Sequence, residues 1–403
     1  MFRPFLSTEI PVNRKPRRSS RHTSDRARAT ARSLRGARAI GSTLLVLASV
    51  LAGYAAVLES WTQQFPNQMP SARFFHAMTY DSARHEVVLF GGLDGSQQTV
   101  FGDTWVWNGV NWIEKTPPAG PPPIPTSPPQ RFSADMVFDT GRNEVVLFGG
   151  LGGQVFGDTW VWDGATWILR ATGGPPPRLD PGMAYDASRR EVVLFGGDGG
   201  SSGELDDTWV WDGTSWTQKF PAAHPSARLR HAMTFDAARS EVVLFGGGLK
   251  SLPSLTADTW VWDGINWTQR FPAVSPPSTG FSSMVFDAVR SRVILFGGQD
   301  DVVVARNDTW AWDGTNWTRL FPPTSPSPRI GHRMAYDSGR HETVLFGGTT
   351  LHGDAFDDTW VLVSSVGPPT NRDDCKHEGW RVFNMPRAFK NQGDCIQFVN
   401  TGK

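Results

Sequence analysis

The sequence predicts an all-β protein, a six-bladed β-propeller whose last blade is closed by the N-terminal strand. Three observations predict it. One segment recurs six times, with Met-x-[Tyr/Phe]-Asp, a Val-rich run ending in Phe-Gly-Gly, and Asp-Thr-Trp. The repeat length is close to 50 residues, which is typical of a propeller blade. The sixth repeat lacks its last strand, and a matching strand precedes the first. The glycine pairs are Gly91-Gly92, Gly149-Gly150, Gly196-Gly197, Gly246-Gly247, Gly297-Gly298 and Gly347-Gly348.

Each repeat contains four strand-like segments, as the fourth repeat illustrates. Residues 232–235 (strand a) and 241–245 (strand b) are rich in aliphatic and aromatic side chains and flank a short turn. Residues 259–262 form strand c. Asp263-Gly264 then reverses the chain before strand d at residues 267–269, because glycine adopts a positive φ at little cost. Four such antiparallel strands make one blade.

The ends of the repeat array predict how the ring closes. The sixth repeat has no Trp-Asp-Gly-x-x-Trp after its Asp-Thr-Trp, so strand d is missing there. Residues 61–66 (Trp-Thr-Gln-Gln-Phe-Pro) match residues 216–221 (Trp-Thr-Gln-Lys-Phe-Pro) at five of six positions. We therefore expect the N-terminal strand to complete the last blade and cover both open edges.

These repeats resemble the kelch family, for which paired glycines after strand b and a spaced aromatic residue are diagnostic. The likeness covers residues 61–363. It implies a kelch-like propeller of the kind found in bacterial secreted proteins and in the central domain of galactose oxidase. Kelch propellers serve as adaptors, sugar-processing enzymes and copper oxidases, so the resemblance implies a fold rather than one activity.

The N-terminal region differs in composition from the repeats. Residues 1–38 hold eleven Lys and Arg against Glu9 and Asp25, a net charge of +9, and we expect a disordered leader. Residues 39–58 contain no charged side chain and are long enough to span a bilayer. They predict a signal peptide or a transmembrane signal anchor, with cleavage left open. We interpret the basic leader as an orientation signal and expect no nucleic-acid partner.

The C-terminal region is predicted as a linker, residues 365–374, followed by a small module, residues 375–403. The chain has only two cysteines, Cys375 and Cys395, and both lie in this module. One disulfide is the preferred interpretation in an exported protein, against free thiols or half of a metal site. The module resembles a short segment found at the C-termini of otherwise unrelated secreted bacterial proteins, which implies an extracellular or cell-surface location.

The candidate binding residues cluster at one end of the expected channel. Antiparallel strands place the a–b and c–d connections on one face and the b–c and d–a connections on the other. The b–c and d–a connections vary between repeats, and variable loops on a rigid scaffold commonly carry binding sites. An arginine precedes the strand-a Met by five residues in five repeats, and a histidine precedes it by two residues in three. These residues are Arg73, Arg131, Arg178, Arg228 and Arg329, with His76, His231 and His332.

Two interpretations of these residues stay open. A ring of guanidinium groups can clamp a carboxylate or an acidic sugar. Alternatively, each arginine pairs with the aspartate of Asp-Thr-Trp, and the histidines have a structural role. The aspartates are Asp103, Asp158, Asp207, Asp258, Asp308 and Asp358, and the fifth repeat has Thr279 in place of arginine.

The predicted function is an exported binding module that recognises a protein or a glycan and needs no catalysis. The repeats hold no cysteine for a galactose-oxidase-like copper site and no Ser-His-Asp, phosphate-loop or zinc-helix motif. We expect a monomer without a cofactor or metal. The alternative is a carbohydrate-active enzyme, such as a kelch-type sugar mutarotase or epimerase, using general acid–base chemistry.

Overall fold

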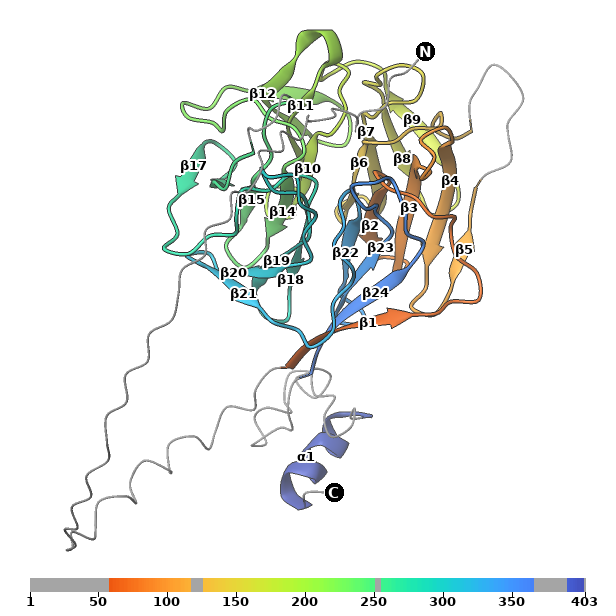
Figure 1. Cartoon of the computed structure of the whole chain (residues 1–403), viewed down its shortest axis with the longest axis vertical. Helices are drawn as coiled ribbons and strands as arrows, with labels where there is room; N and C mark the ends of the chain where they lie inside the picture. The colour runs from red at the N-terminus through yellow and green to blue at the C-terminus, as the bar shows by residue number, and fades with distance from the viewer. Residues whose placement is uncertain (1–57, 117–125, 251–254, 366–389, 402–403) are drawn as a thin grey trace, which may run out of the picture. The chain divides into compact units, whose positions relative to one another are not determined.

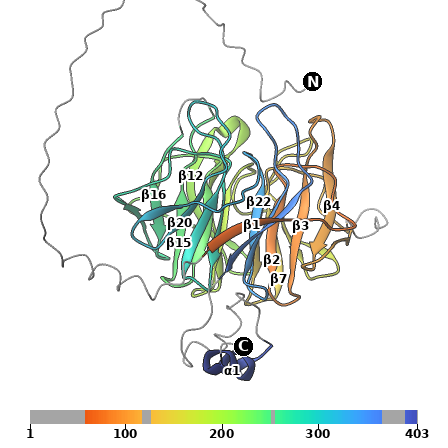
Figure 2. The same ribbon diagram turned by 60° about the horizontal axis from the view of Figure 1, so that its bottom comes forward.

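The computed structural model describes residues 58–116, 126–250, 255–365 and 390–401 (Figure 1). Six antiparallel sheets of four strands each are arranged around a common axis, as Figures 1 and 2 show from two sides. The predicted all-β, six-bladed propeller is confirmed.

The strands follow the predicted order within each blade. Blade 1 contains β2 (Ala77–Asp81), β3 (Glu86–Leu93), β4 (Val100–Trp107) and β5 (Trp112–Glu114). Blade 2 contains β6 (Asp135–Asp139), β7 (Glu144–Phe148), β8 (Thr159–Trp162) and β9 (Trp167–Ala171). Blade 3 contains β10 (Gly182–Asp186), β11 (Glu191–Asp198), β12 (Glu204–Trp211) and β13 (Trp216–Lys219), with a 3₁₀ turn, η1 (Gly200–Ser202).

Blades 4 to 6 repeat this order. Blade 4 contains β14 (Ala232–Asp236), β15 (Glu241–Phe245), β16 (Thr259–Trp262) and β17 (Trp267–Arg270). Blade 5 contains β18 (Ser283–Asp287), β19 (Arg292–Phe296), β20 (Thr309–Trp312) and β21 (Trp317–Leu320). Blade 6 contains β22 (Arg333–Asp337), β23 (Glu342–Phe346) and β24 (Thr359–Ser365), completed by β1 (Leu58–Gln64).

The predicted closure of the ring is confirmed by the pairing of β1. This strand lies antiparallel to β24, with Leu58 opposite Ser365 and Gln64 opposite Thr359. Glu59 is buried and forms an ion pair with Arg292 at the start of strand b in blade 5. The other five blades have glutamate at the position of Arg292. The exchange of charge at this one position gives the closing strand a partner in the neighbouring blade.

Tryptophan side chains join each blade to the blade before it. The tryptophan of strand d donates its indole N–H to the Thr of Asp-Thr-Trp in the preceding blade. Most of these tryptophan and threonine side chains are buried. The pairs are Trp61–Thr309, Trp112–Thr359, Trp167–Thr104, Trp216–Thr159, Trp267–Thr208 and Trp317–Thr259, at 2.8 to 3.1 Å. These tryptophans therefore pack neighbouring blades together, and the N-terminal Trp61 makes the same bond as the others.

The a–b and c–d turns form a face, here called the turn face, in which one set of contacts is repeated. In blade 1 the Asp81 carboxylate accepts the backbone N–H groups of Ala83 and Arg84, and it pairs with the Arg84 guanidinium at 2.6 Å. Arg84 also donates to the carbonyl of Asp163, in the c–d turn of blade 2. Gly164 has φ = 99°, which strains other residues, and a Cβ there would lie 1.9 Å from the Arg84 Nε and displace the arginine. The repeated residues of the turn face therefore hold the blades together.

Several predicted segments lie outside the described residues. These are the leader, the apolar segment before Leu58 and most of the C-terminal region, including Cys375. The described part of the C-terminal module is a helix, α1 (Gln392–Thr401), in which Cys395 is buried. The disulfide stays a prediction because Cys375 is not described. No helix within residues 58–116, 126–250, 255–365 and 390–401 is long and apolar enough to cross a membrane.

Candidate functional site

The five candidate arginines are buried and bound to the aspartates of Asp-Thr-Trp. Arg73 donates from Nη1 and Nη2 to the two carboxylate oxygens of Asp103, at 2.6 and 2.8 Å. It also donates to the carbonyls of Gly91 and Ser71. Burial acts to raise the pKa of Asp103, but the hydrogen bonds and charge of Arg73 outweigh it and hold this pKa below its ordinary value. The same bidentate pairs are Arg131–Asp158, Arg178–Asp207, Arg228–Asp258 and Arg329–Asp358.

In blade 5 the aspartate of Asp-Thr-Trp pairs with an arginine from a different strand. Thr279 replaces the arginine there, and Asp308 instead pairs with Arg319 from strand β21. In blades 1, 2 and 6 an aromatic ring also covers the guanidinium group, as Phe101 covers Arg73 at 4.0 Å. The structure therefore supports the interpretation that these arginines form ion pairs. To bind a ligand, they would have to break buried bidentate pairs.

The three candidate histidines lie between blades. His76, His231 and His332 are buried, and each faces the Phe that ends strand b of the preceding blade. The ring centroids are 5.3 to 5.7 Å apart in the pairs His76–Phe346, His231–Phe195 and His332–Phe296. Burial lowers the pKa of all three, to about 3 for His231, so the imidazoles are neutral at pH 7. Of the three, only His231 also reaches the wall of the central cavity.

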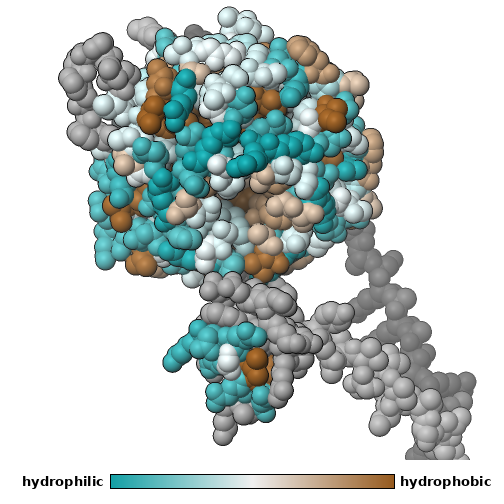
Figure 3. Space-filling model, turned by 180° about the vertical axis from the view of Figure 1, so that it is seen from behind, coloured by the Kyte–Doolittle hydropathy of each residue, from teal (hydrophilic) through white to brown (hydrophobic). Residues whose placement is uncertain are grey.

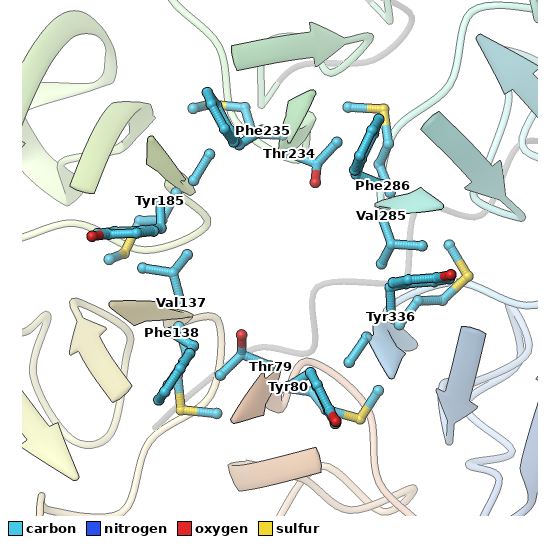
Figure 4. A pocket seen from close by; sticks show the side chains of 18 of the residues that line it. Thr79, Tyr80, Val137, Phe138, Tyr185, Thr234, Phe235, Val285, Phe286 and Tyr336 are labelled. Carbon is cyan, nitrogen blue, oxygen red and sulfur yellow. The ribbon is translucent and has the colours of Figure 1, made fainter. Parts of the chain in front are cut away.

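The first strands of all six blades enclose a central cavity of about 350 Å³. The third residue of each of these strands lines its middle, and Figure 4 shows four of them, Thr79, Val137, Thr234 and Val285, pointing inward. The cavity extends to the first residue of every a–b turn. These residues are Ser82, Thr140, Ala187, Ala237, Ala288 and Ser338. The cavity therefore reaches the turn face, and Figure 3 shows a hollow with apolar walls near the middle of the visible side of the propeller.

A ring of residues in the left-handed conformation lies at the other end of the cavity. Its members stand two residues before strand a, have φ values between 50° and 66°, and are Phe75, Ser133, Asp180, Arg230, Phe281 and Gly331. Backbone N–H groups donate to carbonyls around this ring, for instance from Phe75 to Gly331 and from Ser133 to Phe75, both at 2.8 Å. The rings of Phe75 and Phe281 lie 5.2 Å apart.

None of these six residues lines the cavity. The cavity therefore ends at the left-handed ring, which forms its closed end on the loop side. Left-handed Phe and Arg residues cost conformational energy, and such strain often accompanies a functional site.

Four charged residues of this region were not among the predicted site residues. Asp135 and Arg333 line the cavity at its closed end, and Asp180 and Arg230 belong to the left-handed ring. Burial raises the pKa of Asp135 and of Asp180, and nearby arginines oppose this shift only in part. The sequence could have indicated Asp135 and Arg333, because each is the first residue of strand a and this residue is small in the other four blades. It is Ala77, Gly182, Ala232 and Ser283.

Comparison with known proteins supports the fold and no particular activity. No protein-family model and no curated protein sequence matches the chain. Among solved structures, that of YjhT aligns with a TM-score of 0.54 and 16% sequence identity, over 74% of this chain and 96% of that chain. This likeness supports a kelch-like propeller. Within the described residues, no group of three or more His, Cys, Asp or Glu side chains could hold a metal ion.

Proposed function

We propose that this protein is an exported or cell-surface binding module that recognises a protein partner through the b–c connections. The face formed by these connections and the d–a connections is here called the loop face. The observation that carries the proposal is the contrast between the two faces. The turn face repeats one set of bonds from blade to blade, whereas the b–c connections differ in strand length and conformation.

The differences between the b–c connections are built into the sheets. In blades 1 and 3, strands b and c continue past the glycine pair through a register shift, as far as Leu93 opposite Val100 and Asp198 opposite Glu204. In the other blades, strand b ends at the Phe before the glycine pair. Blade 3 alone among the described connections adds the 3₁₀ turn η1. A rigid ring that presents a different loop from each blade is suited to selective recognition.

The b–c loop of blade 5 carries the most direct indication of a protein partner. Val302, Val303 and Val304 are exposed by 74%, 49% and 44%. The Asp300 carboxylate accepts the backbone N–H groups of Val302 and Val304, which fixes the loop tip. Val303 has φ = 59°, which is unfavourable for a β-branched residue. Three adjacent apolar side chains held rigidly in solvent favour contact with another protein.

The propeller strands begin and end at the turn face. Strand β1 begins at Leu58 and β24 ends at Ser365, and these two residues are paired at the turn face. The segments before residue 58 and after residue 365 therefore join the propeller on the side opposite the b–c loops.

The test is capture of cell-surface or secreted proteins by the immobilised full chain, followed by cross-linking to locate the contact. Val302→Asp should abolish capture of the partner, because it places a charge in an apolar contact. Val110→Asp is the matched control, since Val110 is 69% exposed in a c–d turn of the turn face. Equal loss in both variants, or cross-links confined to the turn face, would contradict the proposal.

A further inference from the structure

We infer that the central cavity is a second, independent site, which binds a small ligand with a carboxylate group and a compact apolar body. The cavity volume of about 350 Å³ lies within the range of small-molecule sites. The left-handed ring closes one end, and the other reaches the turn face. A ligand would therefore enter between the a–b turns, away from the protein-binding loops proposed above.

Arg333 gives the closed end of the cavity its positive charge. This arginine is half-buried and lines the cavity, yet it forms no ion pair with any described residue. Its buried Nε has no hydrogen-bond partner in the described part of the chain. A guanidinium group stays protonated in proteins and presents donors in a planar fork that matches a carboxylate. The five arginines bound to Asp-Thr-Trp contrast with it, because their carboxylate is supplied by the fold.

Asp135 and Asp180 lie close enough to interact with the charge of Arg333, but neither forms an ion pair with it. Asp135 also lines the closed end, but its carboxylate oxygens already accept the backbone N–H groups of Met136 and Met183, at 3.0 and 2.8 Å. Burial raises the pKa of Asp135, which disfavours its charged form. Ser283 accepts the N–H of Met334 at 3.0 Å, and no described residue accepts its hydroxyl proton. Arg333 and Ser283 together thus offer donors to an anionic group.

The cavity wall determines the rest of the ligand. At the level next to Arg333, four of the six strand-a positions are apolar and two are threonine; they are Val137, Ala184, Val285, Ala335, Thr79 and Thr234. At this level the wall offers only the two threonine hydroxyls as partners for the hydroxyl groups of a sugar, whose burial without hydrogen bonds is unfavourable. It suits an aromatic or branched aliphatic body instead. 3-Phenylpropionate combines such a body with one carboxylate and serves as the probe.

The experiment titrates 3-phenylpropionate into the full chain by calorimetry and saturation-transfer NMR. We expect saturable binding to the wild type, and binding weaker by about tenfold or more for Arg333→Gln, because a charge-assisted hydrogen bond is lost. The matched control is Arg230→Gln, which removes the same charge from a ring residue that does not line the cavity. This control should change the affinity by less than about twofold. The neutral amide of the probe should bind to the wild type as weakly as the acid binds to Arg333→Gln.

Three results would overturn the inference: no saturable binding to the wild type, unchanged binding to Arg333→Gln, or equal loss in both arginine variants. Melting curves establish that each variant folds. If Arg333→Gln does not fold, Val285→Glu provides the second test, since a negative charge in the cavity wall should weaken the probe to a similar degree. If 3-phenylpropionate does not bind in the cavity, capture of a protein by the wild type and by Val110→Asp is still expected. The two proposals can therefore fail separately.

Discussion

The hydrogen bond between Trp61 and Thr309 allows a sharp test of how the ring is closed. The indole N–H donates to the threonine hydroxyl at 3.1 Å, and both residues are only 1% exposed. Thr309→Val removes the acceptor but keeps the shape of the side chain, so no cavity forms. The indole N–H is then buried without a partner. Leaving a buried donor unsatisfied costs about 1 to 3 kcal/mol, and we expect the free energy of unfolding to fall by this amount.

The measurement is urea unfolding followed by tryptophan fluorescence, at an unchanged dependence on urea concentration. Thr259→Val is the matched variant at the blade 4–5 boundary, where Trp317 makes the same bond at 2.9 Å. It should cost a similar amount, because the N-terminal Trp61 occupies the same environment as the tryptophans of the other blades. A double-mutant cycle with Trp61→Phe isolates the bond itself. A loss below about 0.3 kcal/mol for Thr309→Val, with a normal loss for Thr259→Val, would refute closure by an equivalent contact.

Three further predictions concern the closing strand, the buried histidines and the strained loop. Deletion of β1 should lower the melting temperature by about 10 °C or more, since it exposes the edge of β24, while a chain beginning at residue 58 should melt like the full chain. His231 has a folded-state pKa of about 3, below its unfolded value, so stability falls as the pH drops from 6.5 toward 3; in urea unfolding at several pH values His231→Ser should reduce this slope by up to about 1.4 kcal/mol per pH unit. Val303→Gly should raise the free energy of unfolding by about 0.5 to 1 kcal/mol, because glycine adopts the left-handed conformation that strains valine. Val304→Gly, at a position without positive φ, should lower the free energy of unfolding. A lower free energy of unfolding in Val303→Gly would show that Val303 is not strained.

The fold was predictable because its determinants are local and repeated. Continuous aliphatic runs, Gly-Gly pairs and Asp-Gly turns identify the strands of each blade, and six copies make the pattern unambiguous. The match between residues 61–66 and 216–221 was sufficient to assign the closing strand. The extension of strands b and c in blades 1 and 3 was not predicted, because it depends on how the chain pairs after a register shift.

The candidate site was predicted less well, for a structural reason. The arginines of the repeat were correctly placed near the aspartates of Asp-Thr-Trp, but sequence alone did not decide between an ion pair and a free ring. The left-handed conformation of Phe75, Arg230 and Phe281 has no signal in these residue types, which normally avoid it. The end at which the cavity closes follows from that conformation. It could therefore not be inferred from the order of the strands.

The two classes of arginine in this protein show how function can be located in a repeat fold. An arginine that recurs in five of six blades has a carboxylate that recurs with it, and both serve the contact between strands that every blade needs. Arg333 occupies a position where the other blades have small residues or an aspartate, and among the described residues its buried Nε has no hydrogen-bond partner. Repetition thus indicates a structural requirement, while a departure from the repeat at an inward-facing position indicates a ligand. By this reasoning the first residue of strand a, rather than the more frequent Arg or His before it, is the position at which substitutions should alter binding without unfolding the ring.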